Sequence, residues 1–259
     1  MEFDRIYAEV DLGRIEENME AMKEHLRPGT KMYGVVKTDA YGHGAVPVAR
    51  TIDRFVCGYA VATVDEGLKL RRHGIEKEIL SLGPVSAGRY QECLENDISL
   101  PMFEYRRAKE LSDAAVAEGK TAKIHIAVDT GMSRIGLFPD EGSVETVKEI
   151  AELPALRIAG MFTHFARADE ADKTKAGEQY RRFHAFCDAV KAAGVEVPVC
   201  HCSNSAGIVE LPDFNMDAVR AGITIYGLYP SDEVKQDIIS LKPAMALKSF
   251  ITYIKEIGP

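Results

Sequence analysis

The sequence lacks the features that would assign it to a membrane, to an export pathway or to nucleic acid. No apolar run approaches the roughly 20 residues that span a bilayer. The N-terminal segment MEFDRIYAEVDLGRIEEN is acidic and polar where a signal peptide has an apolar core. The formal net charge is −8, whereas binding to phosphate backbones calls for a basic face. We therefore expect a cytoplasmic protein that binds neither membranes nor nucleic acid.

A disulfide framework or a metal cluster is also missing from the pattern. The five cysteines are scattered and odd in number, which is typical of reduced thiols in a cytoplasmic protein. Only Cys200-His201-Cys202 brings metal-ligand types together. Zinc pairs are usually spaced by about two to four residues, and alternate residues of a strand point to opposite faces. A buried strand is the better interpretation of this segment, and no metal site is expected.

What the chain does contain is a repeated strand–helix theme. From residue 30 onward, short β-branched runs alternate with amphipathic, charge-rich stretches at intervals of roughly 20 to 35 residues. Helices are predicted over Arg106–Glu118, Ser143–Ala151 and Thr174–Ala193, the last with Gly194 as a C-terminal cap. Strands are predicted over Met32–Lys37, Cys57–Ala62, Glu78–Leu82, Ile98–Phe103, Ala122–Val128, Ile158–Phe165, Val197–Cys202 and Met216–Arg220. Eight such units in order favour a (β/α)8 TIM barrel of the α/β class, with a doubly wound open sheet as the alternative.

The two ends of the chain do not follow this repeat. Tyr7–Val10 is a short strand signal ahead of a predicted helix over Leu12–Leu26, and Ala244–Ile257 alternates like a strand that leaves the barrel. An unpaired strand is an unsatisfied edge. We therefore predict a barrel domain over residues 1–240 and, over residues 241–259, the beginning of a second, β-rich domain.

Candidate functional side chains follow the carboxyl ends of the predicted strands, where the active site of such a barrel lies. No pair of acidic residues holds an equivalent position, which argues against a glycosidase. In strand order the candidates are Lys37, Arg134, His164, Asn204, Ser205, Arg220, Gly222 and Ile223.

Lys37 is the most informative of these residues. It follows the apolar run Tyr33–Val36, so its aliphatic stem begins in a buried strand, although an isolated lysine is usually a solvated surface charge. Desolvation lowers the pKa of a lysine and exposes the neutral amine that a Schiff base requires.

Five segments resemble the alanine racemase family in the same order: VVKTDAYGHG, IHIAVDTGMSRIG, FTHFARADE, HCSNSAG and VRAGITIYGLYP. Together they span residues 31 to 230. The resemblance implies an enzyme that uses pyridoxal 5′-phosphate (PLP) to interconvert L- and D-alanine for peptidoglycan synthesis. It also implies a homodimer in which a C-terminal β-domain completes the site of the partner and supplies a tyrosine as second base. The segment that carries this tyrosine would begin soon after Pro259, so we expect this chain to racemise alanine poorly by itself. The motifs leave alanine, serine or another amino acid open as substrate.

The resemblance also implies a role for each matching residue. Lys37 would hold the cofactor and act as a catalytic base, and Tyr41 would lie near the cofactor phosphate. Arg134 would hold the substrate carboxylate, His164 would pack against the pyridine ring, and Arg220 would contact the pyridine nitrogen. Ser205, Gly222 and Ile223 would bind the phosphate, with Asn204 beside them. Barrels often bind phosphate in these last two loops, at the N-terminus of a short helix.

Structural interpretations remain open for the same residues. His164 could be a core histidine and Tyr41 ordinary packing, while Ser205 could be a helix N-cap. Arg134 could pair with Asp129, and Arg220 with Asp213 or Asp217.

An arginine at the pyridine nitrogen would itself be informative. A guanidinium cannot accept a proton, so the nitrogen would stay largely unprotonated, which suits racemisation more than transamination.

One position departs from the family pattern. Many alanine racemases carry a lysine two residues before the DTG triplet, often carbamylated, where this chain has Ala127. An anionic partner of Arg134 would therefore be missing or replaced by a bound anion. A rival function, a non-enzymatic PLP-binding protein of related barrel fold, would lack the second domain, but the DTGMSR segment belongs to substrate handling.

Overall fold

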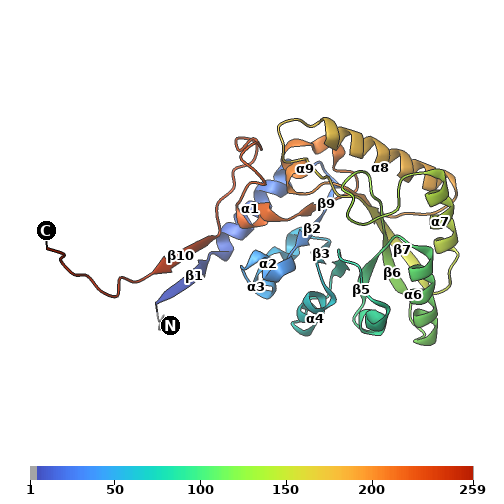
Figure 1. The fold of residues 1–259 in the computed structure, drawn as a ribbon, viewed down its shortest axis with the longest axis horizontal. Coiled ribbons are helices and arrows are strands. Elements are labelled where there is room, and N and C mark those ends of the chain that lie inside the picture. The colour runs from blue at the N-terminus through green and yellow to red at the C-terminus, as the bar shows by residue number, and fades with distance from the viewer. Residues whose placement is uncertain (1–4, 259) are drawn as a thin grey trace.

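The computed structural model describes residues 5–258, and within this range the eight expected strands close into a parallel barrel. Helices surround the barrel, as Figure 1 shows. The TIM-barrel prediction is confirmed, and the doubly wound open sheet is excluded because β2 pairs with β9 as well as with β3. The barrel strands are β2 (Lys31–Val35), β3 (Gly58–Val61), β4 (Glu78–Ser81), β5 (Ile98–Met102), β6 (Ala122–Ala127), β7 (Leu156–Phe162), β8 (Cys200–His201) and β9 (Ala218–Ala221).

The outer helices begin at identifiable caps. Asp11 accepts a hydrogen bond from the backbone N–H of Arg14, and Asp140 accepts one from that of Ser143. Thr63 and Glu66 form a reciprocal capping box. The α-helices are α1 (Leu12–His25), α2 (Lys37–Tyr41), α3 (Ala45–Ile52), α4 (Val64–Arg72), α5 (Tyr90–Glu95), α6 (Tyr105–Ala117), α7 (Glu141–Ala151), α8 (Thr174–Ala192) and α9 (Ser205–Glu210).

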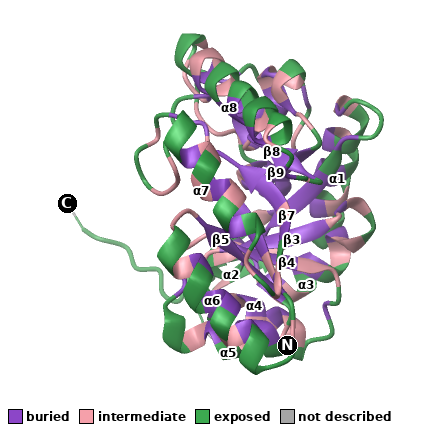
Figure 2. Cartoon of the chain, turned by 90° about the vertical axis from the view of Figure 1, so that its right-hand side faces the viewer, coloured by how far each residue is buried: buried purple, intermediate pink, exposed green. Residues whose placement is uncertain are grey.

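The core lies between the barrel and its helices. The barrel strands are almost entirely buried while the outer helical faces are exposed (Figure 2). Helix α8 ends one residue before its predicted limit, and Gly194 follows with a left-handed φ of 87° that suits a glycine. No helix within residues 5–258 has the length and apolar character needed to cross a membrane.

Strand β8 is shorter than the predicted Val197–Cys202. Pro198 has no N–H to give to the sheet, and the N–H of Cys200 donates to Asp217 Oδ2 instead of a strand carbonyl. Cys200, His201 and Cys202 are all buried, so the interpretation of this segment as a buried strand is confirmed.

The two ends of the chain pair with each other outside the barrel. Strand β1 (Ile6–Val10) runs antiparallel to β10 (Met245–Ser249), and Figure 1 shows this ribbon extending away from the barrel. The predicted final strand is correct in place but ends at Ser249, well before Ile257. Because β1 and β10 lie on either side of the predicted boundary at residue 240, the division into two domains stays a prediction.

Candidate active site

An unusual turn places Lys37 at the mouth of the barrel. Directly after it, four consecutive non-glycine residues have left-handed φ angles, namely 52° at Thr38, 52° at Asp39, 56° at Ala40 and 51° at Tyr41. This conformation costs an L-residue about 1–2 kcal/mol, so the turn holds strain on the order of 4–8 kcal/mol. The turn is α2, a left-handed counterpart of an ordinary helical turn.

Contacts from neighbouring elements hold this turn in place. Glu66 Oε1 accepts the N–H of Thr38 at 2.6 Å. Asp39 Oδ1 accepts the N–H of Ala45 at 2.9 Å and pairs with Lys69 Nζ at 2.7 Å. Backbone strain that surrounding contacts impose is typical of functional sites.

The turn brings the Lys37 amine beside an aromatic ring and a second cation. Lys37 Nζ lies 5.9 Å from the centre of the Tyr41 ring. Burial lowers the pKa of Lys37, the nearby charge of Arg134 lowers it further, and Glu66 opposes the change. The amine is therefore more often neutral, and more nucleophilic, than a surface lysine.

His164 and Arg220 form a further part of the wall of the mouth, and Arg220 lies on β9, the strand that pairs with β2 just before this turn. Arg220 Nη2 donates to His164 Nδ1 at 3.2 Å, so His164 accepts at that nitrogen. Burial lowers the pKa of His164 to about 3, with further contributions from Arg220, Arg134 and Lys37. The imidazole is therefore neutral at physiological pH.

Arg220 is almost fully buried and is held by its two terminal nitrogens. Nη1 donates to Nδ1 and to the carbonyl oxygen of His201, at 2.8 and 3.1 Å. Nη2 also donates to the carbonyl oxygens of Thr163 and Cys202, at 2.8 and 3.1 Å. Burial lowers the pKa of Arg220 to about 10, so it remains a cation at neutral pH. The Nε–H has no acceptor among the described residues, and it is available to a ligand.

A small cradle lies between the last two barrel strands and the turn. Ser205 Oγ accepts the N–H of Gly222 at 3.0 Å and the hydroxyl of Thr224 at 3.0 Å. A Cβ atom at Gly222 would lie 3.4 Å from Ser205 Oγ and 3.7 Å from Tyr41 Oη. The absence of a side chain at residue 222 therefore leaves space between the serine and the tyrosine. The N–H of Ile223 has no acceptor within the described part of the chain.

Asn204 stabilises the start of α9 and does not line the cradle beside Gly222. Its Oδ1 accepts the N–H of Gly207, which makes it the N-cap of α9, and its Nδ2 donates to the carbonyl oxygen of Phe165. The interpretation of Ser205 as the N-cap is therefore wrong. The neighbouring asparagine has that role and leaves the serine hydroxyl free to face Gly222.

Arg134 lies exposed in the loop after β6. Within residues 5–258 it makes no hydrogen bond or ion pair, so the alternative interpretation of a pair with Asp129 is wrong. Asp129 instead accepts the N–H groups of Gly131 and Ser133, at 3.0 and 2.9 Å. Ala127, where an anionic partner was expected to be missing, is buried and adds no polar atom. Arg134 is therefore a free cation at the mouth.

The alternative partners of Arg220 are also wrong. Asp213 pairs with Arg27 at the surface, and Asp217 accepts the N–H of Cys200. No carboxylate contacts the guanidinium in the described structure.

Sequence reasoning missed a polar layer beneath the mouth. His125 and His201 lie inside the barrel at 0% exposure, and Glu78 and Tyr33 join them. The signal was present in the segment Ile124-His125-Ile126, where a polar residue interrupts an apolar strand and alternation turns it toward the interior.

Comparisons with known proteins agree with this arrangement. The family described as alanine racemase, N-terminal domain, matches residues 10–230. The chain belongs to this family. A curated alanine racemase of Clostridium novyi is 44% identical and one of Clostridium tetani is 40% identical, each over 97% of this chain and 65% of the relative. The solved alanine racemase of Clostridium difficile 630 has a TM-score of 0.97 at 39% identity, with 100% of this chain and 68% of that chain covered. The sequence therefore spans about two thirds of the length of these alanine racemases.

Proposed function

We propose that this chain is the PLP-binding barrel of an enzyme that interconverts L- and D-alanine, a reaction that serves peptidoglycan synthesis. The observation that carries the proposal is a half-buried lysine of lowered pKa, held by a strained turn at the mouth of the barrel. Membership of the alanine racemase family supports the choice of alanine over serine. The whole enzyme would be a cytoplasmic homodimer with residues 1–240 as the barrel domain and residues 241–259 leading into the second domain.

The residues present fit the cofactor at three separate points. A primary amine, Lys37, is available to the aldehyde. The cradle of Ser205, Gly222 and Tyr41 has space that a side chain at residue 222 would fill, which suits a phosphate group. The unpartnered Nε–H of Arg220 suits the ring nitrogen. Lys37, Arg134 and Arg220 supply the positive charge that an anionic ligand requires.

When bound, PLP supplies an electron-withdrawing group that makes the Cα–H bond of the amino acid acidic. Lys37 Nζ takes the proton from Cα on one face or returns it there, because its pKa is lowered toward the working pH. Arg134 holds the substrate carboxylate and so fixes which face of Cα lies toward Lys37. The other face needs a base from outside the barrel mouth, in keeping with a site shared between two subunits.

Arg220 and His164 set the electronic character of the site. Arg220 donates and cannot accept a proton, so a ring nitrogen beside its Nε–H would stay unprotonated. His164 is neutral, so it packs against an aromatic ring without adding charge. An unprotonated ring nitrogen beside Arg220 would favour return of the proton to Cα over its transfer elsewhere on the ligand.

Covalent trapping tests the proposal directly. The protein mixed with PLP and then reduced with borohydride should carry one pyridoxyl group, and peptide mapping should locate it on Lys37. The label should be lost in Lys37→Ala and kept in Lys31→Ala, a nearby lysine of β2 that lies on the surface. A label on another lysine in the unmodified protein would show that the cofactor site is elsewhere.

A second function, a non-enzymatic PLP-binding protein, is disfavoured by the free cation at Arg134. A protein that only stores PLP has no need of a residue that binds a carboxylate. Addition of D- or L-alanine to the PLP-loaded protein should therefore change its visible spectrum, and Arg134→Leu should weaken the response to alanine. An unchanged spectrum at saturating alanine would favour the storage function.

A further inference from the structure

The lower interior of this barrel is polar where barrel interiors are usually filled by branched apolar side chains. Tyr33, Glu78, His125 and His201 come from β2, β4, β6 and β8, which are alternate strands of the barrel. Alternate strands contribute the four side chains of one interior layer in such barrels. These residues therefore form a single layer, which we call the polar layer, and it lies directly beneath Arg220.

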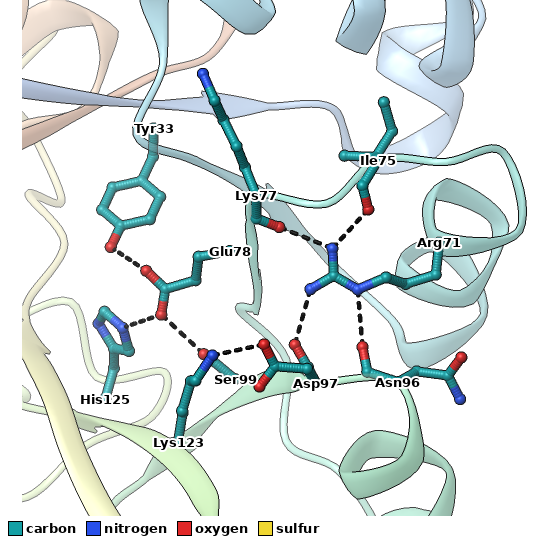
Figure 3. A network of polar contacts seen from close by, with 10 residues as sticks. All are labelled: Tyr33, Arg71, Ile75, Lys77, Glu78, Asn96, Asp97, Ser99, Lys123 and His125. Carbon is teal, nitrogen blue, oxygen red and sulfur yellow. Dashed lines mark hydrogen bonds and ion pairs between the residues drawn. The ribbon is translucent and has the colours of Figure 1, made fainter.

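Contacts link the members of the polar layer in a closed ring. The Tyr33 hydroxyl donates to Glu78 Oε2 at 2.7 Å, and His125 Nε2 lies 3.2 Å from Glu78 Oε1. His125 Nδ1 lies 3.1 Å from His201 Nε2, and the His201 ring stacks on Tyr33 with 5.3 Å between ring centres. Figure 3 shows the carboxylate of Glu78 between Tyr33, His125 and Ser99.

Arg220 fixes the direction of the hydrogen bonds that join His201, His125 and Glu78. A guanidinium only donates, so His201 Nδ1, which is 2.8 Å from Arg220 Nη1, must be an acceptor. The proton of neutral His201 then lies on Nε2 and is donated to His125 Nδ1. The proton of His125 consequently also lies on Nε2 and is donated to Glu78. The hydrogen bonds run in one direction, from a cation at the mouth to a carboxylate at the bottom of the barrel.

The charges at the two ends support this reading. Burial alone would raise the pKa of Glu78, but the interaction with His125 and the hydrogen bonds from Tyr33 and Ser99 lower it to about 2, so the group is ionised. Burial lowers the pKa of His201 well below its usual value, so this imidazole is neutral. A buried cation usually has a paired anion. Since no carboxylate contacts Arg220 in the described structure, Glu78 is its counter-charge at a distance.

We propose that Glu78, acting through His125 and His201, is a positioning residue for Arg220. The chain of donors keeps Nη1 turned toward the polar layer and therefore leaves Nε–H turned toward the mouth. Hydrogen bonds in such a chain polarise one another, so the carboxylate at its end also tempers the donor strength of the guanidinium. The proposal rests on the proposed function in one respect, namely that Nε–H meets the ring nitrogen of PLP.

The direction of the chain can be measured in the protein without cofactor. With 15N-labelled histidine, long-range 1H–15N spectra distinguish the two neutral tautomers among the seven histidines. We expect His125 and His201 both to carry the proton on Nε2. A proton on Nδ1 of either ring, or a doubly protonated ring, at neutral pH would overturn the proposal.

The effect on the cofactor needs a variant that removes the charge and keeps the acceptor. Glu78→Gln does this, and Glu76→Gln is the matched control, because Glu76 is an exposed carboxylate two residues away at the same end of the barrel. The readout is the 15N resonance of the ring nitrogen in bound, labelled PLP. It should move upfield in Glu78→Gln, since Nε–H becomes a stronger donor, and stay unchanged in Glu76→Gln. An unchanged resonance, a downfield shift or equal shifts in both variants would contradict the proposal.

A second variant and the measurement on the cofactor-free protein keep the proposal testable. If Glu78→Gln fails to fold, Glu78→Asp takes its place, because the shorter side chain keeps the charge and lengthens the contact to His125. The ring-nitrogen resonance should again move, and an unmoved resonance counts against the proposal. If the unmodified protein binds no PLP, the proposed function fails while the tautomers of the cofactor-free protein still decide the direction of the chain.

Discussion

The left-handed turn after Lys37 gives a sharp prediction about stability. Ala40 lies in this turn at 0% exposure, and Ala49 lies in the middle of α3 at 0% exposure. Replacing either by glycine removes one buried methyl group, worth about 0.8 kcal/mol, and adds about 0.5–1 kcal/mol of backbone entropy to the unfolded chain. Only Ala40→Gly also relieves left-handed strain of about 1–2 kcal/mol.

Ala40→Gly should therefore be close to neutral, whereas Ala49→Gly should destabilise the protein by about 2 kcal/mol. Urea unfolding followed by circular dichroism, with equal dependence on urea concentration in both variants, measures the difference. The two shared terms cancel, so the difference reports the strain at Ala40 alone. Equal destabilisation of the two variants would show that the turn is not strained, and the argument that surrounding contacts impose it would fail.

Two more predictions concern the cofactor site. Gly222→Val should raise the dissociation constant of PLP by about tenfold or more, or ~1.4 kcal/mol, because the valine side chain fills the cradle between Ser205 and Tyr41. Equilibrium titration measures this constant, and an unchanged affinity would place the phosphate elsewhere. Arg134→Leu removes a charge that lowers the pKa of Lys37, so that pKa should rise and the pH midpoint of PLP attachment should move to higher pH. Arg167→Leu, at a surface ion pair, should leave the midpoint unchanged, and equal midpoints in all three proteins would refute the electrostatic coupling.

The architecture could be predicted because each barrel strand has its own local signal. A short β-branched run predicts a buried strand, and eight such strands that alternate with helices are compatible with only a few chain topologies. The turn at Thr38–Tyr41 could not be predicted, since threonine, alanine and tyrosine have no preference for left-handed φ angles. Contacts from Glu66 and Lys69, distant in sequence, impose that conformation.

The candidate site could be predicted in part for a related reason. The ends of parallel strands meet at one mouth, so residue order alone brings Lys37, His164 and Arg220 together. The polar layer depends instead on which side chains alternation turns inward, and on register between strands that are distant in sequence. The segment Cys200-His201-Cys202 predicts a buried strand, but a strand prediction alone does not predict the contact of His201 with Arg220.

The mouth and the polar layer together show how this barrel separates stability from function. Lys37, Arg134 and Arg220 are like charges brought close together, and such charges repel. Glu78 offsets the charge of Arg220 from below, while Glu66 opposes the lowered pKa of Lys37 from the side. The remaining repulsion disfavours the free protein and is relieved by an anionic ligand. A ligand that binds only the folded state at one hundred times its dissociation constant adds about 2.7 kcal/mol of stability. The repulsion between the cations and the strain of the turn therefore both arise at the mouth, where the free energy of binding an anionic cofactor can offset them. The polar layer lies below the mouth, where its charges are compensated within the protein.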